Sequence, residues 1–181
     1  MRTFSIALAV IGSAAAYGQQ FGAAENLAPY VPTPQGLVEK MLDAARVKPG
    51  ETVYDLGSGD GRVVITAAQK YGANAVGIEV RADLCRIATE KIKALGLQDR
   101  VHMVQGSALH VDLSPADVVT MVLLTSSNEL MKPLLARYLK PGARVVSMQF
   151  PIKGWKPVDT VKAKAGTMEH TVYVYEIGRS N

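Results

Sequence analysis

The chain has 181 residues, enough for one domain with a complete hydrophobic core. Apolar residues make up 48% of it and charged residues 20%, the balance of an ordinary globular protein. The net charge is only +4 and the charges are scattered, so we expect a solvated surface and no nucleic-acid partner. The single cysteine, Cys85, excludes an intramolecular disulfide.

The chain opens with a segment that resembles an export signal. Arg2 is followed by the apolar run S-I-A-L-A-V-I-G-S-A-A-A, which is shorter than the ~20 residues that a membrane span needs. Ala16 and Gly18 have the spacing expected for cleavage before Gln19. Residues 1–20 are therefore predicted to be a signal peptide or an uncleaved N-terminal anchor. The protein would then be exported, periplasmic or held close to a membrane, and this segment is not part of the fold.

A stiff lead-in separates this segment from the domain, which is expected to cover residues 35–181. Residues 21–34 end in A-P-Y-V-P-T-P, whose prolines disfavour a helix and predict an extended chain. Thr33 suits a helix N-cap and Pro34 suits the first helical position. A docking helix is therefore expected to run through residue 36 to about residue 45.

Residues 52–62, T-V-Y-D-L-G-S-G-D-G-R, predict a strand, a glycine loop and the start of a helix over residues 62–71. Three alternating glycines let the backbone approach a ligand, and the helix N-terminus presents free N–H groups. A dinucleotide fingerprint needs a glycine where Arg62 stands, and the Lys and Ser or Thr of a phosphate-binding P-loop are absent. The acid that ends the strand, Asp55, repels phosphate and favours an ammonium group.

A second acid follows at the end of the next predicted strand, A-V-G-I-E-V at residues 75–80. Glu79 lies about 20 residues beyond the loop, where a carboxylate meets the hydroxyls of a ribose. The two acids and the loop predict a nucleoside that carries a cation, a description that S-adenosylmethionine (SAM) fits. The alternative is a tight strand–helix turn without a ligand.

The remaining pattern alternates helices and strands. Helices are expected over residues 82–95 and 128–139, and strands over residues 101–105, 116–124 and 143–150. Residues 158–163 and 171–177 predict a final hairpin. The fold class is therefore α/β: a doubly wound, mostly parallel, Rossmann-like sheet with a C-terminal antiparallel hairpin strand.

Ligands of such a sheet bind beyond the carboxyl ends of its strands. The cofactor side then includes Val80, Ser107 and Ala108. After the fourth strand comes Thr125, which either faces the substrate or caps the next helix. No histidine has a partner at a spacing that argues for catalysis, and the acids after the fourth and fifth strands are too few for a metal.

Aromatic residues mark the substrate side of the predicted site. Phe150 and Trp155 follow the fifth strand, and Tyr30 of the lead-in is expected to fold over them. Aromatic faces attract an alkylammonium or a sulfonium. Trp155 fits a position in the hydrophobic core equally well.

D-L-G-S-G-D-G-R followed by G-I-E-V resembles the first two motifs of class I, seven-strand SAM-dependent methyltransferases. The resemblance implies that SAM is the cofactor and that Glu79 binds its ribose hydroxyls. It also implies that the methionine end is held by Asp55 and the loop residues Gly57, Ser58, Gly59, Asp60 and Gly61. Members of the family often carry an Asp at the position of Ser107, so the adenine contact departs from the pattern.

Together with A-P-Y-V-P-T-P and R-V-V-S-M-Q-F, these motifs look like the small lysine N-methyltransferases of the ATP-synthase c-subunit type. The resemblance implies in-line methyl transfer from SAM to a nucleophile, with a protein lysine as one candidate acceptor. Two alternatives stay open: a methyltransferase for a small molecule or lipid, and a non-catalytic exported nucleoside-binding protein. The export signal favours the second, because SAM is made in the cytosol.

Overall fold

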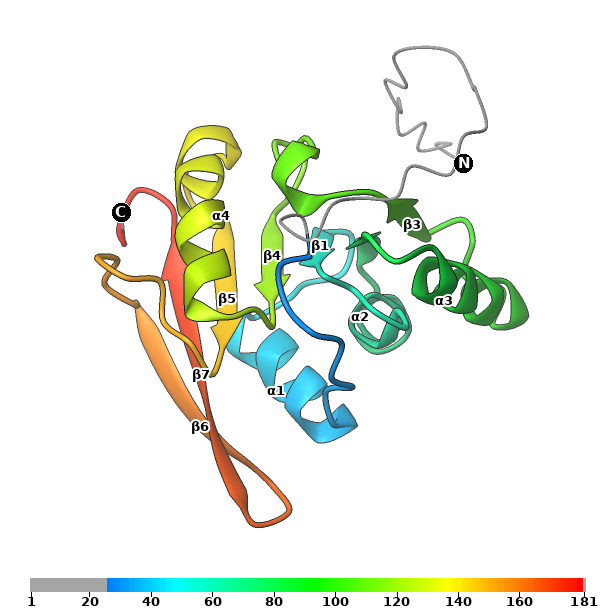
Figure 1. The fold of residues 1–181 in the computed structure, drawn as a ribbon, viewed down its shortest axis with the longest axis horizontal. Helices are drawn as coiled ribbons and strands as arrows, with labels where there is room; N and C mark the ends of the chain where they lie inside the picture. The colour runs from blue at the N-terminus through cyan, green and yellow to red at the C-terminus, as the bar shows by residue number, and fades with distance from the viewer. Residues whose placement is uncertain (1–25, 181) are drawn as a thin grey trace.

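The computed structural model describes residues 26–180, so the predicted signal or anchor segment lies outside the described part. A seven-stranded sheet with the order β3-β2-β1-β4-β5-β7-β6 forms its centre (Figure 1). The strands are β1 (Thr52–Leu56), β2 (Asn74–Glu79), β3 (Val101–Gln105), β4 (Val118–Met121), β5 (Arg144–Met148), β6 (Asp159–Ala165) and β7 (Met168–Glu176). The first five are parallel, and β7 is antiparallel to both β5 and β6. The predicted Rossmann-like sheet with a C-terminal antiparallel hairpin is confirmed.

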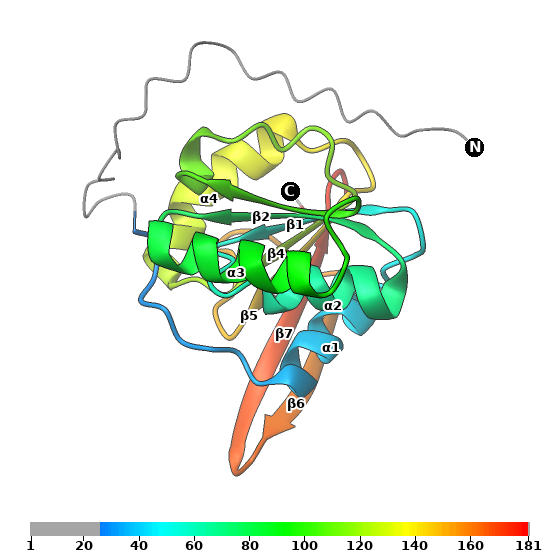
Figure 2. The same cartoon turned by 90° about the vertical axis from the view of Figure 1, so that its right-hand side faces the viewer.

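Helices cover both faces of the sheet, as the edge-on view shows (Figure 2). One face carries α1 (Gln35–Ala44), α2 (Arg62–Tyr71) and α3 (Ala82–Ala94), and the other carries α4 (Thr125–Tyr138) and the short 3₁₀ helix η2 (Ala108–His110). Within residues 26–180, no helix has the length and apolar character to cross a bilayer.

Two hydrophobic clusters hold these layers together. Strand residues alternate between the faces, so Val53 of β1 packs with α1 and α2, whereas Tyr54 and Leu56 join the cluster under α4. All four residues of β4 are buried, as expected for a parallel strand that is covered on both sides.

Two helices begin at other residues than the sequence suggested. The carbonyl of Pro34 accepts the first bonds of α1, from the N–H groups of Leu37 and Val38, so Pro34 and not Thr33 is the N-cap. Helix α4 begins at Thr125, three residues before the predicted start. The side chain of its N-cap residue, Leu124, forms no capping hydrogen bond. Asn128 is buried inside this helix because its amide bonds to the end of β5, which propensity alone does not reveal.

The strand order creates the place for a ligand. From β1 the chain runs outward to β2 and β3, and later from β4 to β5 in the opposite direction. A crevice opens where such directions diverge, beyond the carboxyl ends of β1 and β4. The lead-in, residues 26–33, lines the pocket found there.

Candidate active site

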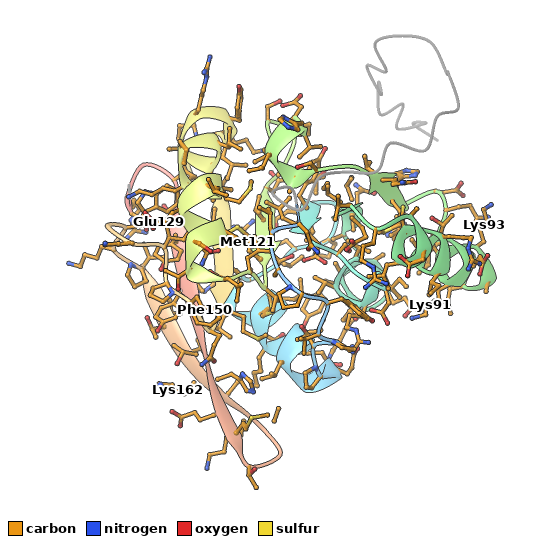
Figure 3. The ribbon with its side chains drawn as sticks, viewed as in Figure 1. Lys91, Lys93, Met121, Glu129, Phe150 and Lys162 are labelled. Carbon is orange, nitrogen blue, oxygen red and sulfur yellow. The ribbon has the colours of Figure 1, made fainter. Side chains whose placement is uncertain are left out.

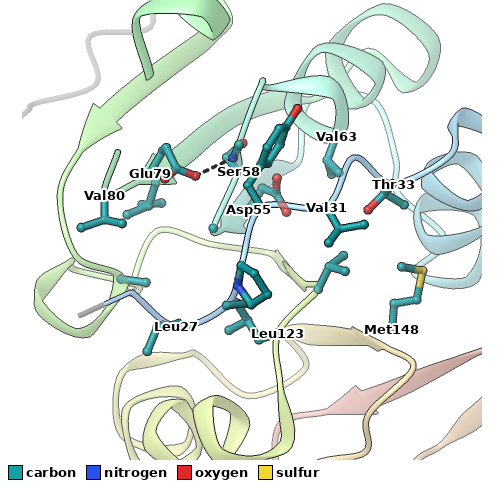
Figure 4. Close-up of a pocket in the computed structure, with 18 of the residues that line it drawn as sticks. Leu27, Val31, Thr33, Asp55, Ser58, Val63, Glu79, Val80, Leu123 and Met148 are labelled. Carbon is teal, nitrogen blue, oxygen red and sulfur yellow. Dashed lines mark hydrogen bonds between the residues drawn. The ribbon is translucent and has the colours of Figure 1, made fainter. Parts of the chain in front are cut away.

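A cavity of about 280 Å³ lies at this crevice. Most of the residues predicted for the site line it: Tyr30, Asp55, Gly57, Ser58, Gly59, Asp60, Glu79, Val80, Ala108 and Phe150. Four predicted residues are not among its lining: Gly61, Ser107, Thr125 and Trp155. Figure 4 shows Asp55 and Glu79 in the upper part of the cavity and Leu123 and Met148 in the lower part.

The loop after β1 requires its glycines. Gly57, Gly59 and Gly61 have φ angles of 81°, 56° and 79°, a region that residues with a Cβ rarely adopt. A Cβ on Gly59 would lie 2.6 Å from Cε2 of Tyr30, and one on Gly61 would lie 2.9 Å from Cβ of Ala88. Because these positions have no side chains, the loop backbone is uncovered toward the cavity. The lead-in and α3 can therefore pack closely around the loop.

Asp55 is a buried carboxylate at the end of the loop's strand, and only 3% of its surface is exposed. Burial raises its pKa to about 6, although the hydroxyl of Thr120 donates a hydrogen bond of 2.7 Å to Oδ1 and opposes that rise. Among the described residues, no lysine or arginine forms an ion pair with it. The carboxylate thus faces the cavity with its charge uncompensated, which favours a cationic ligand.

Glu79 is fixed by two backbone donors. The N–H of Gly59 donates to Oε2 at 2.7 Å (Figure 4), and the N–H of Arg81 donates to Oε1 at 2.8 Å. Each carboxylate oxygen can accept a further hydrogen bond. Glu79 therefore presents two oriented acceptors to the cavity, an arrangement that suits a pair of vicinal hydroxyls.

Asp60 has a different task from the other two acids. Arg62 donates to both of its oxygens, at 2.8 and 2.9 Å, and Lys91 of α3 donates to Oδ2 at 2.8 Å. Burial opposes ionisation, but these two cations outweigh it and lower the pKa of Asp60 to about 2. Arg62 also donates to the carbonyl of Thr33 at 2.6 Å, so this cluster ties the loop to α3 and to the lead-in.

The lead-in crosses the cavity and is held at three places. The hydroxyl of Ser127 donates to the carbonyl of Leu27, and Arg62 holds the carbonyl of Thr33. Between them, the ring of Tyr30 lies against Gly59. The lead-in therefore closes the pocket from above the glycine loop.

Trp155 is not part of the substrate side. Its ring packs edge-on against Tyr175, with centroids 5.8 Å apart, in the cluster under α4, so the expectation that Tyr30 folds over it is wrong. Thr125 is exposed at the first position of α4. Ser107 caps η2, where its Oγ accepts a bond of 3.3 Å from the N–H of Leu109, so its hydroxyl is engaged within the chain.

The opposite end of the cavity differs in character from the acidic end. Its lining comes from the ends of β4 and β5 and from the start of β7: Val122, Leu123, Leu124, Met148, Gln149, Phe150 and His170. None of these residues is an acid, a lysine or an arginine. The pocket therefore joins a polar, anionic half to an apolar half.

A strained turn shapes the apolar half. Gln149 has a φ of 70°, and the N–H of Phe150 donates to the carbonyl of Met148 at 2.9 Å, which closes a γ-turn. The amide of Asn128 and the hydroxyl of Ser147 both donate to the carbonyl of Phe150, at 3.0 and 2.7 Å. Figure 3 shows Phe150 beside the first turns of α4. Strain of this kind is concentrated at functional sites.

The described residues fit SAM. The uncompensated carboxylate of Asp55 suits the ammonium group of the methionine part, and the two acceptors of Glu79 suit the ribose. A Cβ on Gly59 would collide with the ring of Tyr30, so a glycine is needed where the lead-in covers the loop. The sequence motifs predicted this half of the site. Gln149 was not singled out although it lies in R-V-V-S-M-Q-F, and His170 was missed because it belongs to no local motif.

Comparisons with known proteins agree with this fit. The model of the ANTKMT methyltransferase domain matches residues 55–159, more than half of the chain. A protein-lysine N-methyltransferase of Saccharolobus islandicus (strain REY15A) is 49% identical over 151 residues, which cover 83% of this chain and 94% of that relative. An adenine nucleotide translocase lysine N-methyltransferase of Mus musculus is 34% identical over 82% of this chain but only 63% of the mouse protein.

A solved structure supports the cofactor. The crystal structure of an RNA methyltransferase from Salinibacter ruber in complex with S-adenosyl-L-homocysteine superposes with a TM-score of 0.77 at 44% identity. The match covers 81% of this chain and 94% of that one. With its seven-strand fold and its pocket, the chain belongs to the family of the ANTKMT methyltransferase domain and is a SAM-dependent methyltransferase.

Proposed function

We propose that the protein transfers the methyl group of SAM to the side-chain amine of a protein lysine. The observation that carries this proposal is the apolar half of the pocket, which borders the SAM half and has no charged lining. The names of the relatives in Saccharolobus islandicus and Mus musculus support the same acceptor class.

The chemistry of an amine acceptor explains why an apolar half is useful. A free lysine has a pKa of about 10.4, so it is protonated and unreactive near neutral pH. Burial in apolar surroundings favours the neutral amine, which can act as a nucleophile. Leu123, Met148 and Phe150 provide such surroundings at the lower end of the cavity.

The SAM half would then have the task of alignment. SAM supplies a methyl group that its sulfonium already activates. Asp55 would hold the ammonium of the methionine part, and Glu79 would hold the ribose hydroxyls. Tyr30 and the lead-in would keep water away from this half of the site. Fixing two reactants in line contributes much of the rate in reactions of this kind.

RNA is the competing acceptor, because the relative from Salinibacter ruber is described as an RNA methyltransferase. RNA binding depends on basic residues that contact phosphates. Two arginines and no lysine line the cavity among the described residues. These arginines, Arg62 and Arg81, are both at the SAM half, and Arg62 is already engaged with Asp60. The apolar half therefore favours an amine on an apolar stem over a nucleotide.

The test is a competition between the two macromolecules. SAM with a tritiated methyl group is incubated with the full-length protein, a nucleic-acid-free protein extract and total RNA. Both the extract and the RNA are prepared from cells of the organism that makes the protein. We expect the label in the protein fraction, and an Asp55→Asn variant should give much less of it at a SAM concentration near the wild-type Kd. Label in RNA alone, or label in neither fraction, would contradict the proposal.

A further inference from the structure

We propose that His170 is a catalytic residue whose Nε2 accepts the proton that the acceptor ammonium must lose. The inference rests on the proposed function and adds to it the group that removes the proton. His170 lines the apolar half of the pocket together with Met148, Gln149 and Phe150.

The sheet positions His170 next to the acceptor end. It lies near the start of β7, opposite Ala163 of β6, and the neighbouring Thr171 accepts a bond of 2.7 Å from the N–H of Gln149 through its carbonyl. Side chains alternate along a strand, so His170 shares a face with Val172 and Val174, which are buried on the α1 side. Because β7 is antiparallel to β5, its first residues stand at the carboxyl end of the sheet, where the cavity opens.

The bonding of the imidazole is incomplete. Its Nε2 is buried, and among the described residues it has no hydrogen-bond partner. A buried polar atom without a partner costs about 1–3 kcal/mol, so such atoms are rare away from functional sites. His170 lines the cavity at an end whose other lining is uncharged, while its Nε2 atom is itself covered in the ligand-free molecule. When the imidazole carries its proton on Nδ1, Nε2 is a hydrogen-bond acceptor. In the proposed role, the ring turns its Nε2 toward the acceptor amine that enters this end of the cavity.

Three charged groups of the hairpin and of α1 form ion pairs: Lys162, Glu169 and Glu39. Lys162 of β6, which Figure 3 shows on the hairpin, pairs with Glu169 at 3.0 Å and donates to the hydroxyl of Thr171 at 2.9 Å. On α1, Glu39 pairs with Lys70 at 2.5 Å. These pairs leave the imidazole as the base at the acceptor end.

The proposed step is a simple proton transfer. One N–H bond of the acceptor ammonium breaks, and its electron pair stays on the nitrogen as the lone pair that attacks. The proton bonds to Nε2, which becomes part of an imidazolium, and it passes to water after the product leaves. The methylation of an ammonium releases one proton overall, and His170 provides its path.

The test uses His170→Ala with chemical rescue. With the protein acceptor fraction that the wild type labels, we expect kcat to fall by about 10²-fold, the usual contribution of a general base. Added imidazole should restore part of the rate. Pyrazole, which has the same shape but is a far weaker base, should not. Equal rescue by both compounds, or an unchanged kcat, would overturn the proposal.

A binding measurement separates this role from damage to the fold. The affinity of His170→Ala for S-adenosylhomocysteine should stay within about twofold of the wild type, because His170 is at the other end of the pocket. In the complex of the wild type, n-butylamine serves as a probe for the lysine side chain. It should shift the imidazole ¹⁵N signals of His170 and leave those of His102 and His110 in place. No shift at His170 would contradict contact with an amine.

The two proposals fail in different ways. If the wild type labels protein lysine while His170→Ala does so equally well, the proposed function stands and the role of His170 falls. If the wild type labels no lysine, the proposed function itself is wrong.

Discussion

The buried carboxylate of Asp55 suits a cationic ligand but destabilises the folded protein when no ligand is bound. Its carboxyl is buried, and its pKa of about 6 means that the folded protein without ligand disfavours the charged form. Thr120 donates one hydrogen bond, but no cation balances the charge among the described residues. Such a carboxylate is useful only when a cationic ligand enters.

Asp55→Asn is therefore expected to stabilise the ligand-free protein and to weaken cofactor binding. The amide oxygen keeps the hydrogen bond from Thr120, while the buried charge disappears. A pKa raised from 3.8 to about 6 corresponds to about 3 kcal/mol, so the free energy of unfolding near pH ~7.5 should increase by up to about that amount. The affinity for S-adenosylhomocysteine should fall by about 10- to 100-fold, the loss of one charge-assisted contact.

Urea unfolding and calorimetric titration measure the two effects. Asp99→Asn, an exposed acid outside the pocket, is the matched control and should change neither quantity. If Asp55→Asn binds as tightly as the wild type, Asp55 does not hold the ammonium group.

Sequence reasoning predicted the acidic half of the pocket, and of the apolar half it predicted only Phe150. Asp55 and the glycines lie in one short motif, and Glu79 follows at a spacing that topology explains. His170 and Gln149 come together only because β7 runs back along β5, a pairing that no local pattern shows. The sequence left the location of Trp155 open, because an aromatic residue after a strand can contact a ligand or belong to the hydrophobic core. Its packing against Tyr175 shows that it belongs to the core.

Two elements decide the shape of the acceptor half: α4 and the turn after β5. Asn128 connects them, since its amide donates to the hydroxyl of Ser147 at 3.1 Å and to the carbonyl of Phe150 at 3.0 Å. The sequence placed the start of this helix at Asn128, whereas the structure buries Asn128 fully within α4, where it fixes the strained turn at Gln149.

Asn128→Leu should loosen that turn without affecting the SAM half. The new side chain has a similar size but no donors, so we expect a loss of about 1–3 kcal/mol in the free energy of unfolding. The KM for the protein acceptor should rise, while the affinity for S-adenosylhomocysteine stays the same. Steady-state kinetics and calorimetry together test this. A parallel loss of cofactor affinity would show that Asn128 supports the whole pocket.

The lead-in is the other element that the sequence predicted only in outline. Its prolines indicated an extended segment, and residues 26–33 are free of helix and strand. Its path depends on distant partners, namely Ser127, Arg62 and the bare backbone at Gly59. Those contacts are not encoded locally.

Tyr30→Ala should speed the release of the bound cofactor. The ring covers Gly59, so its removal opens the pocket above the loop, and changes of this kind act mostly on dissociation rates. We expect the dissociation rate of S-adenosylhomocysteine to rise about tenfold in a stopped-flow displacement experiment. Tyr138→Ala, a comparably exposed tyrosine on α4 outside the pocket, is the control. An unchanged rate would mean that the lead-in does not retain the ligand.

At the scale of the whole molecule, the fold was more predictable than the site. Alternating strand and helix patterns indicated the parallel sheet, and the final apolar runs indicated the hairpin. Such patterns can be recognised because burial on one or two faces of an element determines the spacing of its apolar residues in the sequence. The boundaries were less accurate: β4 is shorter than its apolar run, and β6 and β7 extend farther into their hairpin.

The pH dependence of stability should report the buried acid. The pKa of Asp55 is raised from 3.8 to about 6, so the folded protein binds this proton more tightly than the unfolded chain does. The contribution of Asp55 to the free energy of unfolding therefore falls as pH rises from about 4 to about 6 and is constant above. Asp60, with a pKa lowered to about 2, acts in the opposite sense, and its stabilisation is lost as pH falls below about 4.

The difference in unfolding free energy between wild type and Asp55→Asn isolates the first effect, because Asp60 is common to both. It should grow between pH 4 and pH 6 in urea titrations. Over the same range the wild type should bind S-adenosylhomocysteine more weakly as pH falls, because protonated Asp55 no longer attracts an ammonium group. A pH-independent difference would contradict this assignment.

The central claim is that the acceptor is a lysine amine. The most direct measurement is the identity of the methylated residue in the labelled protein fraction, obtained by complete acid hydrolysis and amino-acid analysis with mass spectrometry. We predict that the tritium elutes as ε-N-methylated lysine and that Asp55→Asn gives much less of it at the same SAM concentration. Label on any other residue, or label that hydrolysis removes from the amino acids, would contradict the account.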